Sequence, residues 1–272
     1  METPEDEVRR WAGMFDGLAE TYDQSGVAFF GPIAAGLVDR VGPRPGERAA
    51  DIGAGRGAAT FRLAEAVGPG GGVDAIDLAP GMVELTGRAA RERGLSQVRV
   101  ALGDATDPPL SESSYDVLTA SLVLFFLPDP VAALRRWAGL LVPGGRLGVA
   151  TFRPWPPSWQ AVEDLFAEYA DDTGRPGPTT MPDVYSHDAG VELLLDRAGL
   201  TGVRTETADY PIVFADVEQW RVWSLGTAMR GLWLRAPEES HPEILGRVAD
   251  LLESTDGTLD VSARYTLGAR PE

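Results

Sequence analysis

The spacing of apolar side chains along the chain changes near residue 47. Before it, apolar residues recur every three or four positions, which predicts amphipathic helices over 5–22 and 30–41. After it, short apolar runs alternate with stretches of helical period, the pattern of βαβ units in a parallel sheet. We expect strands at 48–52, 73–76, 98–102, 115–120 and 146–152, and helices between them at 58–67, 80–93 and 130–141.

A second set of elements follows the fifth strand. The segment 153–186 is rich in Pro and Trp and contains one amphipathic helix; after it we expect a helix at 188–198, a strand at 203–210, helices at 216–230 and 238–252, and a last strand at 259–267. We therefore expect one domain over 1–272. It comprises an N-terminal helical cap (1–45), a ligand-binding core (46–152), lid insertions over the substrate site (153–186 and 211–255) and the last strand (256–272).

The charged residues exclude several functions. Acidic residues number 41 and basic residues 24, for a net charge of −17, and such a field opposes binding to nucleic acid. All 24 basic residues are Arg, so a Lys Schiff base and a P-loop Lys are excluded. Cys is absent, which excludes a thiol nucleophile, and we predict no metal site. Without an apolar run of bilayer length or a signal peptide, we expect a cytoplasmic protein that binds no membrane.

A glycine loop follows the first expected strand. In the segment 50–58, Gly53 and Gly55 allow backbone to pass close to a ligand. This spacing also satisfies the dinucleotide-binding fingerprint, so the glycines alone leave a nicotinamide cofactor open. Asp51 argues against it, because a carboxylate two residues before the first glycine repels a pyrophosphate, whereas it can hold an ammonium group.

Two further acids follow the next two expected strands. Asp77 lies 22 residues beyond Gly55, where a carboxylate accepts hydrogen bonds from ribose hydroxyls. Asp104 follows the third strand and is suited to accept a hydrogen bond from an adenine amino group. An ammonium, a ribose and an adenine are all parts of S-adenosylmethionine, so the three acids together favour that cofactor.

In these motifs the sequence resembles the class I S-adenosylmethionine-dependent methyltransferases, particularly their quinone-biosynthesis-like branch. The resemblance rests on the glycine loop, the two later acids and the segments 15–23, 115–119 and 141–147. It implies an α/β Rossmann-like fold, with a mostly parallel seven-stranded sheet, an antiparallel last strand, helices on both faces and a helical lid. It also implies that the cofactor contacts Gly53, Ala54, Gly55, Asp77, Leu78, Met82, Asp104, Ala105 and Ser121.

The substrate is expected to be a small hydrophobic or aromatic molecule. After the fourth strand the chain has Ser121-Leu122-Val123-Leu124 where enzymes acting on amides or nucleobases carry Asn/Asp-Pro-Pro-Tyr. Trp side chains gather beyond the fifth strand, and apolar pockets with few polar groups bind such molecules. The candidate substrate-binding residues are Phe15, Trp155, Trp159, Trp220 and Trp223.

Two residues are candidates for catalysis. His187 precedes an expected helix, whose dipole favours the neutral, basic imidazole. Tyr22 resembles a tyrosine that closes over the cofactor in relatives. Methyl transfer needs chiefly positioning of the acceptor, so a base is optional, and the acceptor atom stays open between O, N and C.

Two alternatives stay open beside a methyltransferase of bacterial secondary metabolism. One is an NAD-dependent oxidoreductase, which the glycine spacing allows. The other is a protein that binds S-adenosylmethionine without transferring methyl. The oligomeric state is expected to be monomer or homodimer.

Overall fold

The computed structural model describes residues 4–170 and 182–272, and its centre is one seven-stranded sheet. The strand order is β3-β2-β1-β4-β5-β7-β6. Every neighbouring pair is parallel except the two that include β7, which confirms the predicted sheet and its antiparallel last strand. The strands are β1 (Arg48–Ile52), β2 (Gly72–Asp77), β3 (Val98–Leu102), β4 (Tyr115–Ser121), β5 (Leu141–Phe152), β6 (Thr201–Val213) and β7 (Thr258–Ala269).

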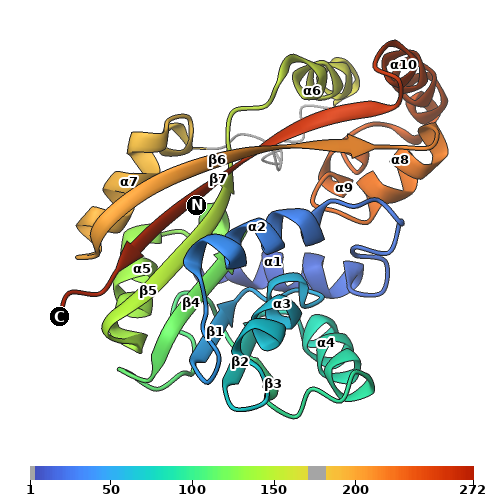
Figure 1. The fold of residues 1–272 in the computed structure, drawn as a ribbon. Helices are drawn as coiled ribbons and strands as arrows, with labels where there is room; N and C mark the ends of the chain where they lie inside the picture. The colour runs from blue at the N-terminus through green and yellow to red at the C-terminus, as the bar shows by residue number, and fades with distance from the viewer. Residues whose placement is uncertain (1–3, 171–181) are drawn as a thin grey trace.

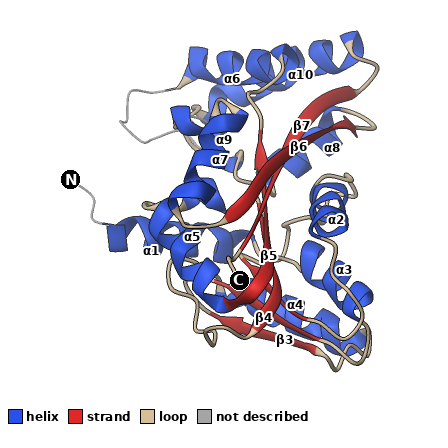
Figure 2. Cartoon of the chain, turned by 60° about the vertical axis from the view of Figure 1, so that its left-hand side comes forward, coloured by secondary structure: helices blue, strands red, loops and turns tan. Residues whose placement is uncertain are grey.

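Helices cover both faces of this sheet, as the resemblance implied. Figure 2 shows α2 (Phe30–Val41) and α3 (Ala58–Val67) on one side and α5 (Pro130–Leu140) and α7 (Asp188–Arg197) on the other. The remaining helices are α1 (Pro4–Leu18), α4 (Pro80–Glu92), α6 (Pro157–Tyr169), α8 (Val217–Leu225), α9 (Arg230–Trp233) and α10 (His241–Ser254), with short 3₁₀ turns η1 (Leu124–Phe126), η2 (Asp183–Tyr185) and η3 (Glu238–Ser240).

Two separate apolar cores lie on the two faces. On one face, side chains of α2 and α3 pack on β1 and β4, with Leu63 and Val117 fully buried. On the other, α5 and α7 pack on β4 and β5 around the fully buried Trp137. The central strands are buried on both faces, which explains why they appear in the sequence as continuous apolar runs rather than as alternating patterns.

The last two strands extend beyond the rest of the sheet. Figure 1 shows β6 and β7 running together to the helices α6, α8, α9 and α10, which gather around their far end. There they form a third and larger core that includes Trp159, Trp220, Trp223 and Trp233. The predicted insertions after β5 therefore share one core with the strand ends; part of the first insertion, residues 171–181, lies outside the described residues.

A crevice is expected where the chain leaves β1. The strand β1 lies between β2 and β4. The connection after β1 leads to β2 on one side, and the connection after β4 leads to β5 on the other, so the two connections diverge between β1 and β4. In open α/β sheets this switch point, at the carboxyl ends of the strands, is where ligands bind. The glycine loop that follows β1 lies at this point.

Two helices differ most from the sequence expectation. The first helix ends at Leu18 instead of 22, and the chain then turns through Asp23, whose positive φ of 57° cannot continue a helix. The expected helix over 216–230 ends at Leu225, and residues 226–229 separate α8 from α9. The Thr227 hydroxyl donates to the Ser224 carbonyl and accepts from the Met229 amide, a local pattern that competes with the helix.

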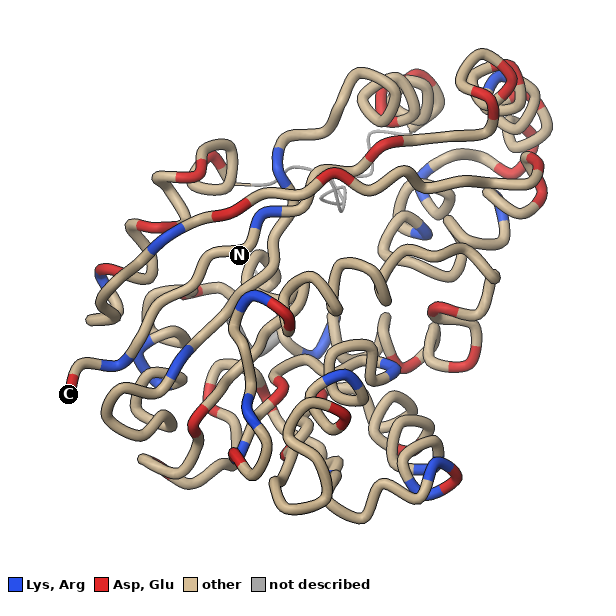
Figure 3. Tube along the Cα trace, viewed as in Figure 1, with Lys and Arg blue, Asp and Glu red and all other residues tan. Residues whose placement is uncertain are grey.

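Charges are distributed over the whole molecule. Figure 3 shows acidic and basic positions interspersed along the outer helices and loops, within the net charge of −17. In residues 4–170 and 182–272, no helix has the length and apolar content that crossing a bilayer requires.

Candidate functional site

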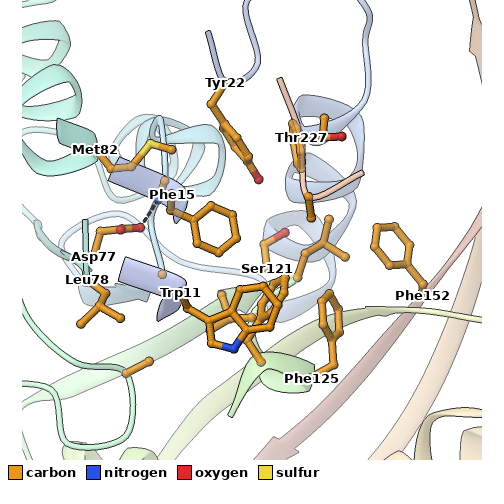
Figure 4. A pocket seen from close by; sticks show the side chains of 18 of the residues that line it. Trp11, Phe15, Tyr22, Asp77, Leu78, Met82, Ser121, Phe125, Phe152 and Thr227 are labelled. Atoms are coloured by element: carbon orange, nitrogen blue, oxygen red, sulfur yellow. Dashed lines mark hydrogen bonds between the residues drawn. The ribbon is translucent and has the colours of Figure 1, made fainter. Parts of the chain in front are cut away.

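One large cavity opens at the carboxyl ends of β1, β2, β3 and β4. Its walls come from three parts of the chain, and most of them are apolar (Figure 4). The N-terminal segment contributes Val8, Trp11, Phe15, Tyr22, Phe29 and Phe30; the strand ends and the helices after them contribute Gly53, Gly55, Asp77, Leu78, Met82, Gly103, Asp104, Ala105, Ser121, Leu122, Val123, Phe125, Phe126 and Leu127; the part beyond β5 contributes Phe152, Trp155, Trp159, Glu163, Trp223, Thr227, Ala228 and Met229.

The glycine loop forms the floor at the switch point. Gly53 and Gly55 have positive φ angles of 68° and 51°. A Cβ at Gly53 would lie 2.3 Å from Val123 Cγ2, so this position has no room for a side chain. A Cβ at Gly55 would meet only Tyr22, at 3.8 Å, because it faces the cavity. Because Gly55 has no side chain, a ligand in the cavity can approach the backbone of the loop there.

The side chain of Asp77 is fixed beneath this loop. One carboxylate oxygen accepts from the Gly55 amide at 2.7 Å and the other from the Ala79 amide at 2.9 Å. Burial raises the pKa of Asp77 above its ordinary value, while the amide hydrogen bonds oppose that rise. Each oxygen has a lone pair left, so the carboxylate can accept two more hydrogen bonds, which matches the diol of a ribose.

The ends of β3 and β4 bring the next predicted residues to the same wall. The Asp104 carboxylate accepts from the Thr106 amide at 2.8 Å, which orients it beside the cavity. The Trp137 indole donates to the Ala105 carbonyl at 2.7 Å and fixes that loop to α5. Leu78, Met82 and Ser121 complete this wall. These residues fit S-adenosylmethionine, since the Asp77 carboxylate can accept from the ribose and the apolar side chains of Leu78, Met82 and Ala105 can line the space for a planar base.

Two predicted cofactor residues lie behind the wall. Asp51 is 1% exposed, and its oxygens accept from the Thr60 hydroxyl at 2.6 Å and the Thr119 hydroxyl at 2.9 Å. Burial raises the pKa of Asp51 to about 6, although both hydroxyls oppose that shift. Ala54 is also absent from the lining residues. Direct contact of Asp51 or Ala54 with the cofactor stays a prediction that the cavity does not support.

Tyr22 lies in the turn after α1 and points its hydroxyl into the cavity (Figure 4). Its ring stacks on the Phe30 ring, with the two ring centroids 4.5 Å apart, and meets the Phe15 ring edge-to-face, with the centroids 6.1 Å apart. Burial, assisted by the charges of Asp23 and Asp77, raises the pKa of Tyr22 above its ordinary value. The phenol is therefore neutral near pH 7 and can donate a hydrogen bond, but it is a poor base.

The other predicted catalytic residue, His187, lies elsewhere. It is exposed at the start of α7 and is absent from the lining of the cavity. Its place before a helix agrees with the sequence expectation. We assign it no part in the site.

Four of the five candidate substrate residues meet in the cavity. Phe15 lies in the N-terminal wall, and Trp155, Trp159 and Trp223, from the part of the chain beyond β5, form an aromatic row in the same cavity. Neighbouring rings in that row are 5.6 Å apart between Trp155 and Trp159 and 5.5 Å between Trp159 and Trp223. Trp220 is fully buried in the core and lines no part of the cavity.

Sequence reasoning missed several lining residues, of which Glu163 is the most informative. In α6 the buried face carries Trp159, Val162 and Phe166, and Glu163 falls within that same stripe. An acid on the apolar face of a helix is a signal that could have identified it. Trp11 and Phe125 were also missed, since apolar residues of their kind are indistinguishable from core in a sequence.

Comparison with known proteins agrees with this geometry. The methyltransferase domain family matches residues 50–149. Nocamycin O-methyltransferase from Saccharothrix syringae is 39% identical over 231 residues, which cover 81% of this chain and 82% of the relative. Aklanonic acid methyltransferase DauC from Streptomyces sp. (strain C5) is 41% identical over 170 residues, covering 60% and 77%.

A solved structure supports the fold. Haemonchus contortus phosphoethanolamine N-methyltransferase 2, in complex with S-adenosylhomocysteine, aligns with a TM-score of 0.62 and 15% identity over 100% of this chain and 61% of its own. The two curated relatives, and not this structure, decide between the open alternatives in favour of methyl transfer rather than nicotinamide chemistry. The chain belongs to the S-adenosylmethionine-dependent methyltransferases.

Proposed function

We propose that this methyltransferase transfers the methyl group of S-adenosylmethionine to an oxygen atom of a hydrophobic, ring-containing small molecule of bacterial secondary metabolism. The observation that carries the proposal is the aromatic row of Trp155, Trp159 and Trp223, which lines the same cavity as the residues at the strand ends. Aromatic walls with few polar groups suit flat apolar ligands. The two curated relatives, named for nocamycin and aklanonic acid, support the substrate class, and the first supports oxygen as the acceptor.

The strand-end wall holds the cofactor in this proposal. Asp77 accepts the ribose hydroxyls, Asp104 accepts from the adenine amino group, and the Gly55 backbone leaves room for the amino-acid part. The residues proposed to contact it are Gly53, Gly55, Asp77, Leu78, Met82, Asp104, Ala105 and Ser121. When bound, S-adenosylmethionine supplies a methyl group already activated by its sulfonium.

The rest of the site acts by positioning. The aromatic row and Phe15 hold the acceptor ring against the cofactor wall and exclude water from between them. Orientation of this kind contributes about 7–11 kcal/mol to lowering a barrier. Tyr22 is a neutral phenol between the proposed cofactor-binding and acceptor-binding residues. It donates a hydrogen bond and takes no proton.

An acceptor survey tests the proposal. Matched pairs that differ only in the acceptor atom, such as 2-naphthol with 2-naphthylamine and 1-naphthol with 1-naphthylamine, are incubated with S-adenosylmethionine. Release of S-adenosylhomocysteine and the mass gain of one methyl group are followed. We expect turnover of the oxygen member of a pair; turnover only of amines, or only of small polar acceptors, would contradict the proposal.

We further propose that the protein works in the cytoplasm on a free small molecule, as a monomer or homodimer, and that it binds no nucleic acid. The net charge of −17 supports the last point. The segments after β5, which contribute Trp155, Glu163 and Thr227 to the cavity, are proposed to form its lid. Size-exclusion chromatography with light scattering measures the oligomeric state.

A further inference from the structure

Glu163 is the titratable residue of the cavity that the cofactor does not use. Four titratable residues line the cavity within the described part of the chain: Tyr22, Asp77, Asp104 and Glu163. The first three belong to the strand-end wall or to the turn that faces it. Glu163 alone comes from α6, among the aromatic side chains of the part beyond β5.

The surroundings of Glu163 are apolar apart from one indole. Its helical neighbours on the same face, Trp159 and Phe166, are 2% and 1% exposed. The Trp155 indole lies beside the carboxyl group and lowers its pKa. An acid in such a place is costly for folding unless it binds something, because a leucine there would pack without loss of hydration.

No cation of the described residues neutralises Glu163. Burial, together with the adjacent charge of Asp164, raises its pKa to about 7, and the Trp155 indole opposes that rise. Arg247 on α10, which packs against α6, is held by Glu168 in an ion pair of 2.6 Å. The other charged or titratable side chains on the elements packed against α6 are Arg230 of α9, His241, Glu243, Asp250 and Glu253 of α10, and Asp260, Arg264 and Tyr265 of β7.

A ligand that fills the aromatic row displaces water from this carboxyl group. Removal of water disfavours the charged form, so the acid becomes more fully protonated in the complex than in the open cavity. A protonated carboxyl can accept from Trp155 through its carbonyl oxygen and donate its own O–H into the cavity. It acts there as a hydrogen-bond donor and takes no proton from the acceptor.

We infer that Glu163, in its neutral form, is a specificity-determining residue that donates a hydrogen bond to a carbonyl or oxyanion oxygen of the methyl acceptor. This inference rests on the proposed function, and it names the substrate class more closely: a hydrophobic ring bearing an oxygen that accepts a hydrogen bond, and not a cationic amine. Because only the neutral form donates, acceptor binding takes up one proton from solvent when the pH is above about 7.

The test uses 2-naphthoate, whose charge is constant between pH 6 and 8.5, as the probe. Its Kd for the wild type, saturated with S-adenosylhomocysteine, is measured by fluorescence quenching of Trp or by calorimetry. We expect the Kd to increase about 30-fold from pH 6 to 8.5, since a site that must be protonated loses affinity tenfold per pH unit above its pKa. A constant Kd, or no binding at any pH, would overturn the inference.

Three variants sharpen the test. Glu163→Gln keeps an N–H donor at every pH, so its Kd should stay within about twofold of the wild-type value at pH 6 throughout the range. Glu163→Met removes the donor and should bind weakly at every pH. Glu168→Gln makes the same chemical change on the exposed side of α6 and should keep the wild-type pH dependence.

These variants also separate a donor from a base. If Glu163 instead removed a proton from the acceptor, Glu163→Gln would lose methyl transfer by about 10²-fold or more while binding stayed constant, which contradicts the inference. Calorimetry with S-adenosylhomocysteine alone should give equal affinities for all three variants and the wild type. A failure of the proposed function would appear separately, as an acceptor survey in which amines are methylated.

Discussion

The two walls of the cavity are built by different physical means. The proposed cofactor wall is made of backbone turns and short polar side chains at the ends of β1 to β4, and its geometry depends on local hydrogen bonds such as those of Asp77. The proposed acceptor wall is made of large aromatic side chains from α1, α6, α8 and the segment before α6, which meet only when the chain is folded. The first wall is suited to one fixed ligand; the second can vary in shape while the first stays constant.

The comparison predicts that damage to the cofactor wall is the most severe. Asp77→Ala removes the acceptor of the Gly55 and Ala79 amides together with the proposed partner of the ribose. Hydrogen bonds to charged groups contribute about 1.5–3 kcal/mol each, so the Kd for S-adenosylmethionine should increase at least about 100-fold in calorimetry. Asp74→Asn, on the same strand but paired with Tyr115 away from the cavity, should leave it unchanged. Equal affinity in Asp77→Ala and wild type would contradict the assignment of this wall.

Damage to the acceptor wall should affect the other ligand alone. Trp155→Ala removes one partly buried ring from the aromatic row. We expect the KM for the acceptor to increase about tenfold, as the loss of an aromatic contact predicts, while the Kd for S-adenosylmethionine changes by less than about twofold. If both constants changed equally, the two walls would not be separate.

A smaller effect is expected where α1 joins the walls. The Asp16 carboxylate accepts from the Gly81 amide at 2.7 Å and so ties α1 to the start of α4. Asp16→Ala should weaken binding of S-adenosylmethionine about threefold to fivefold, because one exposed hydrogen bond to a charged group contributes little net free energy. Asp16→Asn, which keeps an oxygen acceptor, should recover most of the affinity.

The smallest effect concerns stability and pH. The folded protein holds the pKa of Glu163 at about 7, above the value of about 4.5 for an unfolded chain. The native state therefore binds more protons between these values, and the stability from this group is full below pH 4.5 and lost as the pH rises through 7. Glu163→Gln should raise the Tm by a few degrees at pH 8 and leave it nearly unchanged at pH 4.5, as scanning calorimetry can show. A lower Tm at pH 8 would mean that the ionised carboxylate has an undetected partner.

The sequence predicted the cofactor wall better than the acceptor wall. The glycine loop, Asp77 and Asp104 follow successive strands, and parallel strands place their carboxyl ends at one edge, so order along the chain determines position in space. Asp51 shows the limit of that reasoning. Its distance from the first glycine is suited to a ligand, but the hydroxyls of Thr60 and Thr119, nine and 68 residues away, occupy both of its oxygens.

The acceptor wall depends on contacts between distant segments. Trp220 and Trp223 lie three residues apart on α8, yet the first is enclosed by the core and the second lines the cavity. Their separation is set by how α8 packs against α6 and α10, which no local pattern specifies. His187 was chosen as one of only two histidines, and rarity says nothing about where the fold places it.

A crystal structure of the protein with S-adenosylhomocysteine and 2-naphthoate tests the division into two walls most directly. The account predicts the ribose hydroxyls on the Asp77 carboxylate and the naphthalene ring against Trp155 and Trp159, with its oxygen at Glu163. A complex in which the ribose lies away from Asp77, or in which the ring binds outside the aromatic row, would contradict it.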